Sequence, residues 1–370
     1  MLEDDAAPGV IVHHVAARTG RYVGSPAFAV LPDGRYVASH DHFGPGCRRD
    51  QTFIYQSTDR GASWQQIAEL TGQWWSSLFT HEGALYLFGT TTEYGHCVIR
   101  RSTDGGVTWT TPEGPATGLL RSGRHHTTPG PVLVAKGRIW RAMEDAQAPG
   151  NWGEMFRAFM MSAPVDADLL DAGQWQATPP MESRHTWLWG DFGGWLEGNA
   201  VQTPDGEIVN VLRVDSFADG TEKAAIMHIG DDGLSATFDP DCDVIPFPGG
   251  SKKFTIRYDV PSGRYLSLVN DVPTPQLDGI GVRARNTLSL VSSLDLRHWT
   301  RHTTLLHHPD DRLHGFQYVD WLTEDEDLLF LSRTAHGTGE AAAHSHHDAN
   351  YLTFHRVPGF RKHMPNGSNE

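Results

Sequence analysis

Side chains that suit acid–base and anion-binding chemistry gather in a few short segments of this chain. The 370 residues include 21 histidines, and histidines stand in five polar segments, the last three of which also hold arginine: 40–42, 93–96, 124–126, 184–195 and 333–347. Imidazole titrates near neutral pH, and guanidinium groups match carboxylates with paired hydrogen bonds. Aromatic faces stack on the C–H surfaces of sugars. Ordinary surface loops favour Lys, Glu and Ser, so this composition favours a functional surface with acid–base and anion-binding groups.

The overall composition excludes several classes of protein. Acidic residues number 45 and basic residues 30, a formal charge of −15, which argues against a nucleic-acid binder. The sequence contains no apolar run long enough to span a membrane. Cys47, Cys97 and Cys242 are too few and too scattered for a disulfide scaffold or a cysteine-rich zinc site. The 39 glycines and 12 tryptophans are typical of a turn-rich β protein.

Two copies of a turn motif, S-T-D-x-G-x-[ST]-W, occur 45 residues apart, in segments 57–64 and 102–109. Segment 293–299 is a degenerate copy of this motif, and segment 230–233 resembles a still more degenerate one. The Asp carboxylate can accept hydrogen bonds from turn amides, Gly supplies a positive φ, and Trp covers the turn. We expect these residues to be structural: Asp59, Gly61, Trp64, Asp104, Gly106 and Trp109.

A second tight turn precedes a strand-like run six times: 35–39, 84–89, 138–142, 207–212, 264–269 and 327–331. Each unit has a further strand before the position of the first motif. Repeated units of four short antiparallel strands predict an all-β propeller with six blades, as a single domain over residues 1–370. The last unit lacks a fourth strand, and Val10–His13 can supply it and close the ring. A seventh, irregular blade between residues 165 and 200 is the alternative.

Strand direction sorts the connections of such a propeller onto two faces. Both tight turns of each blade share one face, and the longer loops with the unusual polar residues share the other. Ligands of propellers bind over the central channel at such a face. We therefore expect one polar bowl that holds the histidines, arginines and tryptophans.

The S-T-D-x-G-x-[ST]-W motif resembles the Asp box of sialidase-like propellers. Sialidases carry an early Arg-Ile-Pro element whose arginine binds the sialate carboxylate, whereas this chain reads Tyr22-Val23-Gly24-Ser25-Pro26 there. Several longer stretches are similar to Asp-box propellers that release terminal L-rhamnose from rhamnosyl-glucuronate and, more distantly, to ulvan lyases: 24–41, 94–102, 137–145, 314–321 and 347–351. Those relatives are usually described as seven-bladed.

The resemblance implies β-elimination next to a uronic acid. A cationic group neutralises the carboxylate, a base removes the C5 proton, and an acid protonates the leaving oxygen. On this hypothesis His96 and His126 are base and acid, and Arg157 and Arg213 lie near the carboxylate. The expected substrate-binding residues are His40, Asp41, Glu144, Glu197, Asn199, Lys253, His314, Arg333 and His347.

Two other functions stay open at this stage. Exo-acting hydrolysis of the sialidase or rhamnosidase type would use paired carboxylates from among Asp41, Glu144 and Glu197, and Glu197 stands where sialidases carry a glutamate. A non-catalytic glycan-binding propeller would need only aromatic residues such as Trp74, Trp75, Trp187, Trp189 and Trp195.

We expect no cofactor. A metal site at His336, His344, His346 and His347 lacks the helical spacing or cysteine pair of a closed site. The expected partner is an anionic oligosaccharide of plant or algal type, with no nucleic acid or membrane. The acidic start, Met1–Asp5, does not resemble a secretory signal, so we expect either a cytoplasmic protein or one that has lost a leader.

Overall fold

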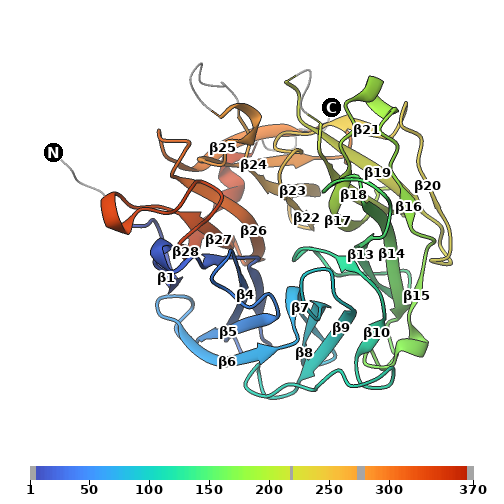
Figure 1. The fold of residues 1–370 in the computed structure, drawn as a ribbon, viewed down its shortest axis with the longest axis horizontal. Coiled ribbons are helices and arrows are strands. Elements are labelled where there is room, and N and C mark those ends of the chain that lie inside the picture. Colours follow the sequence, from blue (N-terminus) through green and yellow to red (C-terminus); the bar gives the residue numbers. More distant parts are fainter. Residues whose placement is uncertain (1–5, 217–219, 273–279, 365–370) are drawn as a thin grey trace.

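Short antiparallel strands surround a central axis in the computed structural model, which describes residues 6–216, 220–272 and 280–364. Within these residues the strands form six sheets arranged in a ring (Figure 1). The prediction of a six-bladed β-propeller is confirmed, and the alternative of seven blades is wrong. Residues 165–200, the place of the alternative seventh blade, hold the split outer strand of blade 3 and the start of the first strand of blade 4. The acidic start lies outside the described residues.

The first three blades follow the predicted order of strands. Blade 1 contains β3 (Ala27–Val30), β4 (Tyr36–Phe43), β5 (Gln51–Ser57) and β6 (Gln65–Thr71), and β2 (Tyr22–Val23) pairs with the far end of β4. Blade 2 contains β7 (Trp74–His81), β8 (Ala84–Thr90), β9 (Cys97–Ser102) and β10 (Leu119–Arg121). Blade 3 contains β11 (His125–His126), β12 (Leu133–Ala135), β13 (Arg138–Ala146), β14 (Phe156–Pro164), β15 (Gln176–Ala177) and β16 (Met181–Glu182).

The other three blades complete the ring. Blade 4 contains β17 (Trp195–Gln202), β18 (Ile208–Val214), β19 (Lys223–Ile229), β20 (Ala236–Thr237) and β21 (Val244–Pro246). Blade 5 contains β22 (Thr255–Asp259), β23 (Arg264–Val269), β24 (Thr287–Ser293) and β25 (Thr300–His307). Blade 6 contains β26 (Gly315–Glu324), β27 (Asp327–Ala335), β28 (Tyr351–Val357) and the N-terminal β1 (Val10–His14).

Strand β1 closes the ring, as the sequence predicts. It pairs antiparallel with β28, so the start and the end of the chain share one sheet. The core between this sheet and blade 1 includes Val12, Phe28, Tyr36, Leu331 and Phe354. Each blade boundary buries a comparable apolar cluster, and burial of apolar surface supplies most of the stability of such a stack.

The turn motifs form the hydrogen bonds that their residue types predict. Asp104 accepts hydrogen bonds from the backbone amides of Val107 and Thr108, each at 3.0 Å, and from the hydroxyl of Ser102 at 2.8 Å. The indole of Trp109 donates to the carbonyl of Gly106 at 2.8 Å. Asp59 and Asp295 accept corresponding bonds in the other two motifs. These contacts fix the turns between third and fourth strands.

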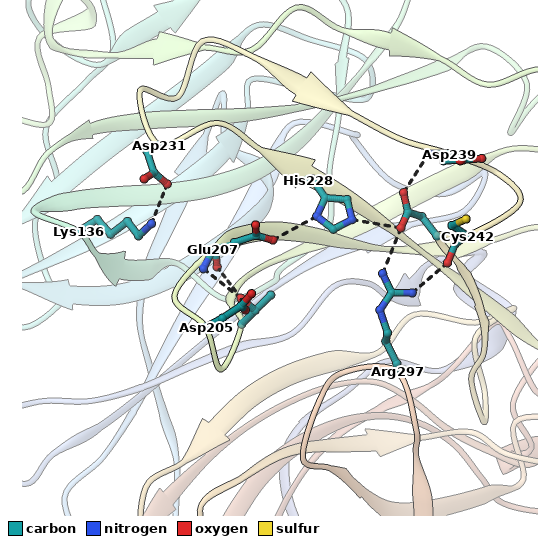
Figure 2. A network of polar contacts seen from close by, with 10 residues as sticks. Lys136, Asp205, Glu207, His228, Asp231, Asp239, Cys242 and Arg297 are labelled. Atoms are coloured by element: carbon teal, nitrogen blue, oxygen red, sulfur yellow. Dashed lines mark hydrogen bonds and ion pairs between the residues drawn. The ribbon is translucent and has the colours of Figure 1, made fainter.

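Polar contacts between neighbouring blades join the turns on this face (Figure 2). Lys136, in the first turn of blade 3, pairs with Asp231 of blade 4 at 2.7 Å. Arg297, in the motif of blade 5, donates to the carbonyl of Cys242 at 2.9 Å and to Asp243 at 3.1 Å. His228 contacts the same Asp243 oxygen at 3.1 Å. Charged residues on this face therefore tie turns of adjacent blades together.

Short 3₁₀ helices occupy parts of the longer connections: Ala17–Thr19, Ala172–Gln174, Trp187–Gly190, Gly281–Arg283, Gly339–Ala341 and Phe360–His363. No helix in the described residues has the length and apolar character needed to cross a membrane. Four second strands, β4, β13, β18 and β27, extend further than the sequence predicts. Asp41, Glu144, Arg213 and Arg333 therefore lie on strands rather than in loops.

Candidate functional site

Three innermost strands carry a β-bulge at corresponding positions. The pairing shifts between Trp74 and Ser77 in β7, between Leu196 and Asn199 in β17, and between Gln317 and Asp320 in β26. Within these bulges Trp75, Glu197 and Tyr318 have φ values of 48°, 59° and 54°. Bulky residues adopt this backbone region at a cost of about 1–3 kcal/mol, and such strain concentrates at functional sites. Each bulge lies near the strand start, on the face predicted to carry the chemistry.

The bulges bring Tyr318 into contact with Glu197. The phenol oxygen donates a hydrogen bond of 3.0 Å to Oε1 of Glu197, and Oε2 accepts a bond of 2.9 Å from Nη1 of Arg213. Glu197 is buried, whereas Tyr318 is partly exposed. Burial raises the pKa of Glu197, but the charge of Arg213, with His126 and the phenol, outweighs burial and lowers it overall. The carboxylate is therefore ionised and aligned to accept the phenol proton.

Three buried guanidinium groups surround this phenol. Arg213, Arg285 and Arg333 all act on the pKa of Tyr318, which burial raises. The guanidinium of Arg333 lies 4.6 Å from the centre of the phenol ring, and its Nη2 lies 3.2 Å from the Nε2 atom of His347. Nη1 of Arg285 lies 3.3 Å from Nε2 of His346. Neutral histidines thus orient two of the three arginines.

Two of the three arginines near Tyr318 have no paired carboxylate in the described residues. Arg213 pairs with Glu197, but in the described parts of the chain Arg285 and Arg333 form no ion pair with a carboxylate. Burial lowers the pKa of Arg285 to about 10, so this side chain stays cationic at neutral pH. A buried cation is stable only where an opposite charge or hydrogen bonds compensate for lost water. The arrangement therefore favours binding of an anion beside the phenol.

Asp41 is a buried acid close to this group. Its two oxygens accept hydrogen bonds of 2.9 Å from the backbone amides of Ser25 and Trp75. Burial raises its pKa to about 6, despite those bonds and the charge of Arg333. Asp41 and Tyr318 both act on the pKa of Arg333, which places all three in one neighbourhood. A carboxyl group with this pKa can hold a proton in mildly acidic solution and donate it.

His126 lies at the edge of the site and is held by Glu144. Nδ1 of His126 lies 3.0 Å from Oε2 of Glu144, and the other Glu144 oxygen accepts a 3.1 Å hydrogen bond from the amide of Gly198. Trp75 meets the imidazole edge-on at 4.6 Å between ring centres. Glu144 therefore positions both the imidazole and the backbone bulge that carries Glu197.

The structure gathers some of the predicted site residues and separates others. His126, Arg213, Glu197, Asp41, Arg333 and His347 belong to the neighbourhood of Tyr318. Arg157 instead forms a bidentate pair with Asp145, with both bonds at 2.7 Å. His96 is exposed in a loop, where its Nδ1 contacts the backbone of Gly123 at 3.2 Å. No contact in the described residues joins Arg157 or His96 to Glu197.

Other predicted substrate-binding residues are engaged with backbone. Asn199 is fully buried, and its amide contacts backbone groups of Val211 and Ile256. Lys253 donates 2.8 Å to the carbonyl of Val319, next to Tyr318, and burial lowers its pKa to about 8. Both residues position bulges. His314 lies in a separate group of histidines with His308 and His336, and His40 lies in another with His13 and His42.

The sequence offers no reason to place Tyr318 or Arg285 in the site, and it points to His346 only as a candidate metal ligand. Tyr318 and Glu197 occupy corresponding places on the innermost strands of alternate blades, so a comparison of those strands could have identified the pair. Arg285 stands just before β24 without any motif around it. Its position near Tyr318 depends on the packing of blades 5 and 6.

No protein-family model matches this chain, and no curated protein matches it. Among solved structures, an α-L-arabinanase from Penicillium chrysogenum in complex with arabinobiose has a TM-score of 0.58 and 17% identity, covering 95% of this chain and 98% of that one. An α-L-arabinofuranosidase from Fusarium graminearum has a TM-score of 0.59 and 12% identity, over 96% and 98%. A Hadza microbial sialidase has a TM-score of 0.61 and 14% identity, over 95% and 68%. At these identities the comparisons establish the propeller fold.

Proposed function

We propose that this protein is an exo-acting glycoside hydrolase whose substrate ends in a sugar with a carboxylate group. One observation carries the proposal: the hydrogen-bonded pair of Tyr318 and Glu197 lies among three buried arginines. This corresponds to the hydrolase alternative of the sequence analysis. The three solved structures reported above are named as enzymes that act on sugars, which supports the same class of reaction.

The arginines support an anionic sugar over a neutral one. The arabinanase was solved with arabinobiose, a sugar without a carboxylate. Binding of a neutral sugar would leave Arg285 and Arg333 without an ion-pair partner, whereas a carboxylate can accept two parallel hydrogen bonds from a guanidinium. A sialic or uronic acid meets this requirement.

The phenol of Tyr318 suits attack on the anomeric carbon of such a sugar. A carboxylate nucleophile would be repelled by the substrate carboxylate, while a neutral phenol is not, and tyrosine nucleophiles are known among sialidases. Glu197 accepts the phenol proton as the new C–O bond forms. Asp41 protonates the oxygen of the leaving sugar, which takes the electron pair of the breaking C–O bond. Asp41, now ionised, then takes a proton from water as the water oxygen attacks the anomeric carbon and the bond to Tyr318 breaks, and Glu197 returns its proton to the phenolate. The two displacements give net retention.

The same groups could also catalyse the β-elimination that the family resemblance implies. An arginine could neutralise a uronate, and Tyr318 or His126 could remove the C5 proton. Elimination leaves a conjugated unsaturated acid, whereas hydrolysis leaves two saturated sugars. The product therefore distinguishes the two reactions, and we favour hydrolysis because Glu197 lies within hydrogen-bonding distance of the phenol.

The test is a product assay on a panel of glycosides. The panel contains aryl glycosides of sialic acid, glucuronic acid and arabinofuranose, together with a rhamnosyl-glucuronate disaccharide. Hydrolysis predicts release of the aryl group from an acidic sugar with no rise in absorbance at about 235 nm, where the unsaturated acid of an elimination absorbs. A rise in that absorbance would favour elimination, and activity on arabinofuranoside alone would contradict the anionic substrate.

Tyr318→Phe is the variant to assay, with Tyr258→Phe as its control. Tyr258 is an exposed tyrosine near the tight turn of blade 5, away from the bulges. We expect the first variant to lose at least a thousandfold in kcat and the second to keep wild-type activity. Equal activity in both variants would show that Tyr318 is not the nucleophile.

A further inference from the structure

Three histidines meet where the N-terminal strand closes the ring. His40 and His42 lie two residues apart on β4 of blade 1, and His13 lies on β1, the outer strand of blade 6. Successive side chains of a strand point to opposite faces. His40 and His42 therefore share one face of β4, and Asp41 faces the other way, toward Trp75.

The three imidazoles have the spacing of a metal site. One ring nitrogen of each lies within 4.8 Å of the others, and the ring centres of His13 and His40 are 4.8 Å apart. Nitrogens bound to one tetrahedral zinc ion would be about 3.3 Å apart, so small movements of the rings suffice. Phe53 packs against the cluster at 4.8 Å from the His42 ring and 5.4 Å from the His40 ring.

The Nε2 atoms of the three histidines are available as metal ligands. The Nε2 atoms of His13, His40 and His42 are all buried, and none has a hydrogen-bond partner in the described residues. His40 and His42 expose only 1% and 5% of their surface. Buried polar groups without partners are rare because each costs about 1–3 kcal/mol, and three in one place need an explanation.

The second ring nitrogens of His13 and His40 have contacts of the kind that orient metal ligands. Nδ1 of His40 donates to the carbonyl of Asp41 at 2.8 Å, which leaves its Nε2 unprotonated. Nδ1 of His13 lies 3.0 Å from the hydroxyl of Tyr55. Metal-bound histidines almost always form such a contact through the second nitrogen.

We propose that His13, His40 and His42 bind one divalent transition metal ion of the zinc class, which joins β1 to β4. Neutral imidazole is a ligand for zinc, copper and nickel, and three histidines leave a fourth position for water. Burial lowers the pKa of His13 to about 4 and that of His42 to about 3, so the ligands are neutral without loss of protons. The charge of Arg21 opposes a cation, but Arg21 is exposed and therefore screened.

The ion would have a structural role at the ring closure. β1 is held in blade 6 by its pairing with β28, and a metal bond to β4 would add a link across the boundary with blade 1. Anything that binds the folded state alone raises its stability by mass action. The site does not depend on the proposed function, since its ligands face away from Asp41.

This cluster differs from the histidine-rich segment near the C-terminus. His344 and His347 both contact Asp348, at 2.7 and 2.8 Å, and His346 contacts Arg285. Two of these histidines therefore contact arginines of the candidate active site, His346 with Arg285 and His347 with Arg333. His336, the fourth histidine weighed for metal in this segment, lies instead in the group with His308 and His314.

The experiment measures metal binding to the full chain, prepared without a polyhistidine tag and stripped with a chelator. Cobalt is titrated in and followed by visible absorption, and zinc content is then measured by elemental analysis. We expect one ion to bind between β1 and β4. Its affinity should be at least tenfold weaker in His40→Gln and in His42→Gln, and it should be unchanged in His355→Gln. His355 is a buried histidine of β28 outside the cluster. A further variant, His308→Gln, tests whether the second group of histidines takes the ion instead.

A second readout uses the unaltered protein, in case a variant fails to fold. Zinc should slow hydrogen exchange of the backbone amides in β1 and β4 and raise Tm. Less than about 0.1 ion per chain, equal binding in the His42→Gln variant, or protection elsewhere without protection of β1 would overturn the proposal.

Discussion

Tyr318 and Glu197 are 121 residues apart in the chain, and the phenol of one donates a 3.0 Å hydrogen bond to the carboxylate of the other. They come from innermost strands of blades 6 and 4, each displaced by a bulge with a positive φ. The strain at both positions is compensated by contacts nearby, including the Glu144 bond to Gly198 and the Lys253 bond to Val319. The strands of the propeller, and not its loops, therefore position the pair.

Glu197→Gln should reduce both activity and stability. The amide cannot accept the phenol proton, so we expect kcat to fall at least a hundredfold. Arg213 would keep its buried charge without a partner, which costs about 3–5 kcal/mol in the free energy of unfolding. Steady-state kinetics and urea denaturation measure the two effects. Asp259→Asn is the control, because it breaks the buried bidentate pair with Arg361 and should reduce stability while kcat is unchanged.

Arg333→Lys should weaken binding of the acidic sugar. Lysine keeps the charge but loses the planar fork, and loss of a bidentate contact predicts a fall of about tenfold to a hundredfold in kcat/KM. The methyl ester of the same sugar should lose much less. Arg157→Lys is the matched control, since Arg157 is engaged with Asp145. An equal loss in that control would restore the role that the sequence predicts for Arg157.

The pH dependence of kcat/KM should be bell-shaped with an acidic optimum. Asp41 must be protonated, so activity should fall as pH rises through about 6, its raised pKa. Glu197 must be ionised, and its lowered pKa places the other limb below its ordinary value. In Asp41→Asn the alkaline limb should disappear. The value of kcat/KM should be low and should no longer change as pH rises through about 6. An unchanged alkaline limb in this variant would assign the acid to another residue.

The same carboxyl group makes a separate prediction for stability. Because the pKa of Asp41 is raised on folding, the folded state binds its proton more tightly than the unfolded state between pH 3.8 and about 6. The contribution of Asp41 to stability therefore falls as pH rises through that window and stays low above it. The difference in urea midpoint between pH 5 and pH 7 should shrink in Asp41→Asn.

Asp104→Ala should affect stability alone. The variant removes the acceptor for two backbone amides and two hydroxyls of the turn, which predicts a loss of about 1–2 kcal/mol in the free energy of unfolding. Activity at saturating substrate should not change. Asp231→Ala, which removes an exposed ion pair with Lys136, should have wild-type stability. A large loss of activity in Asp104→Ala would contradict the purely structural role of the motif.

The fold could be predicted because its signals are local. The carboxylate of Asp104, the glycine after it and Trp109 are close in sequence, so the contacts that define their turn are local. The last unit lacks a fourth strand in sequence, which predicts that Val10–His13 completes its sheet, and β1 occupies that place. Turn chemistry repeated along the chain thus determines the number and order of the blades.

The site could be predicted only in part because it depends on distant contacts. The sequence gives no sign that a bulge turns Tyr318 toward Glu197, and Arg285 reaches the site through the packing of two blades. His40 and Asp41 were grouped as one polar loop, but β4 extends through both and sends them to opposite faces. Residue type identified a polar surface, whereas strand register decides which side chains meet.

The most direct test of the account is to trap the sugar on Tyr318. A fluorine beside the anomeric carbon slows the release of a covalent intermediate, so the fluorinated acidic sugar that matches the preferred substrate is mixed with the protein and the digest is analysed by mass spectrometry. The account predicts one sugar attached to the peptide that contains Tyr318, and none in Tyr318→Phe. An active protein that carries no adduct while it releases an unsaturated acid, or an adduct on a carboxylate instead, would contradict it.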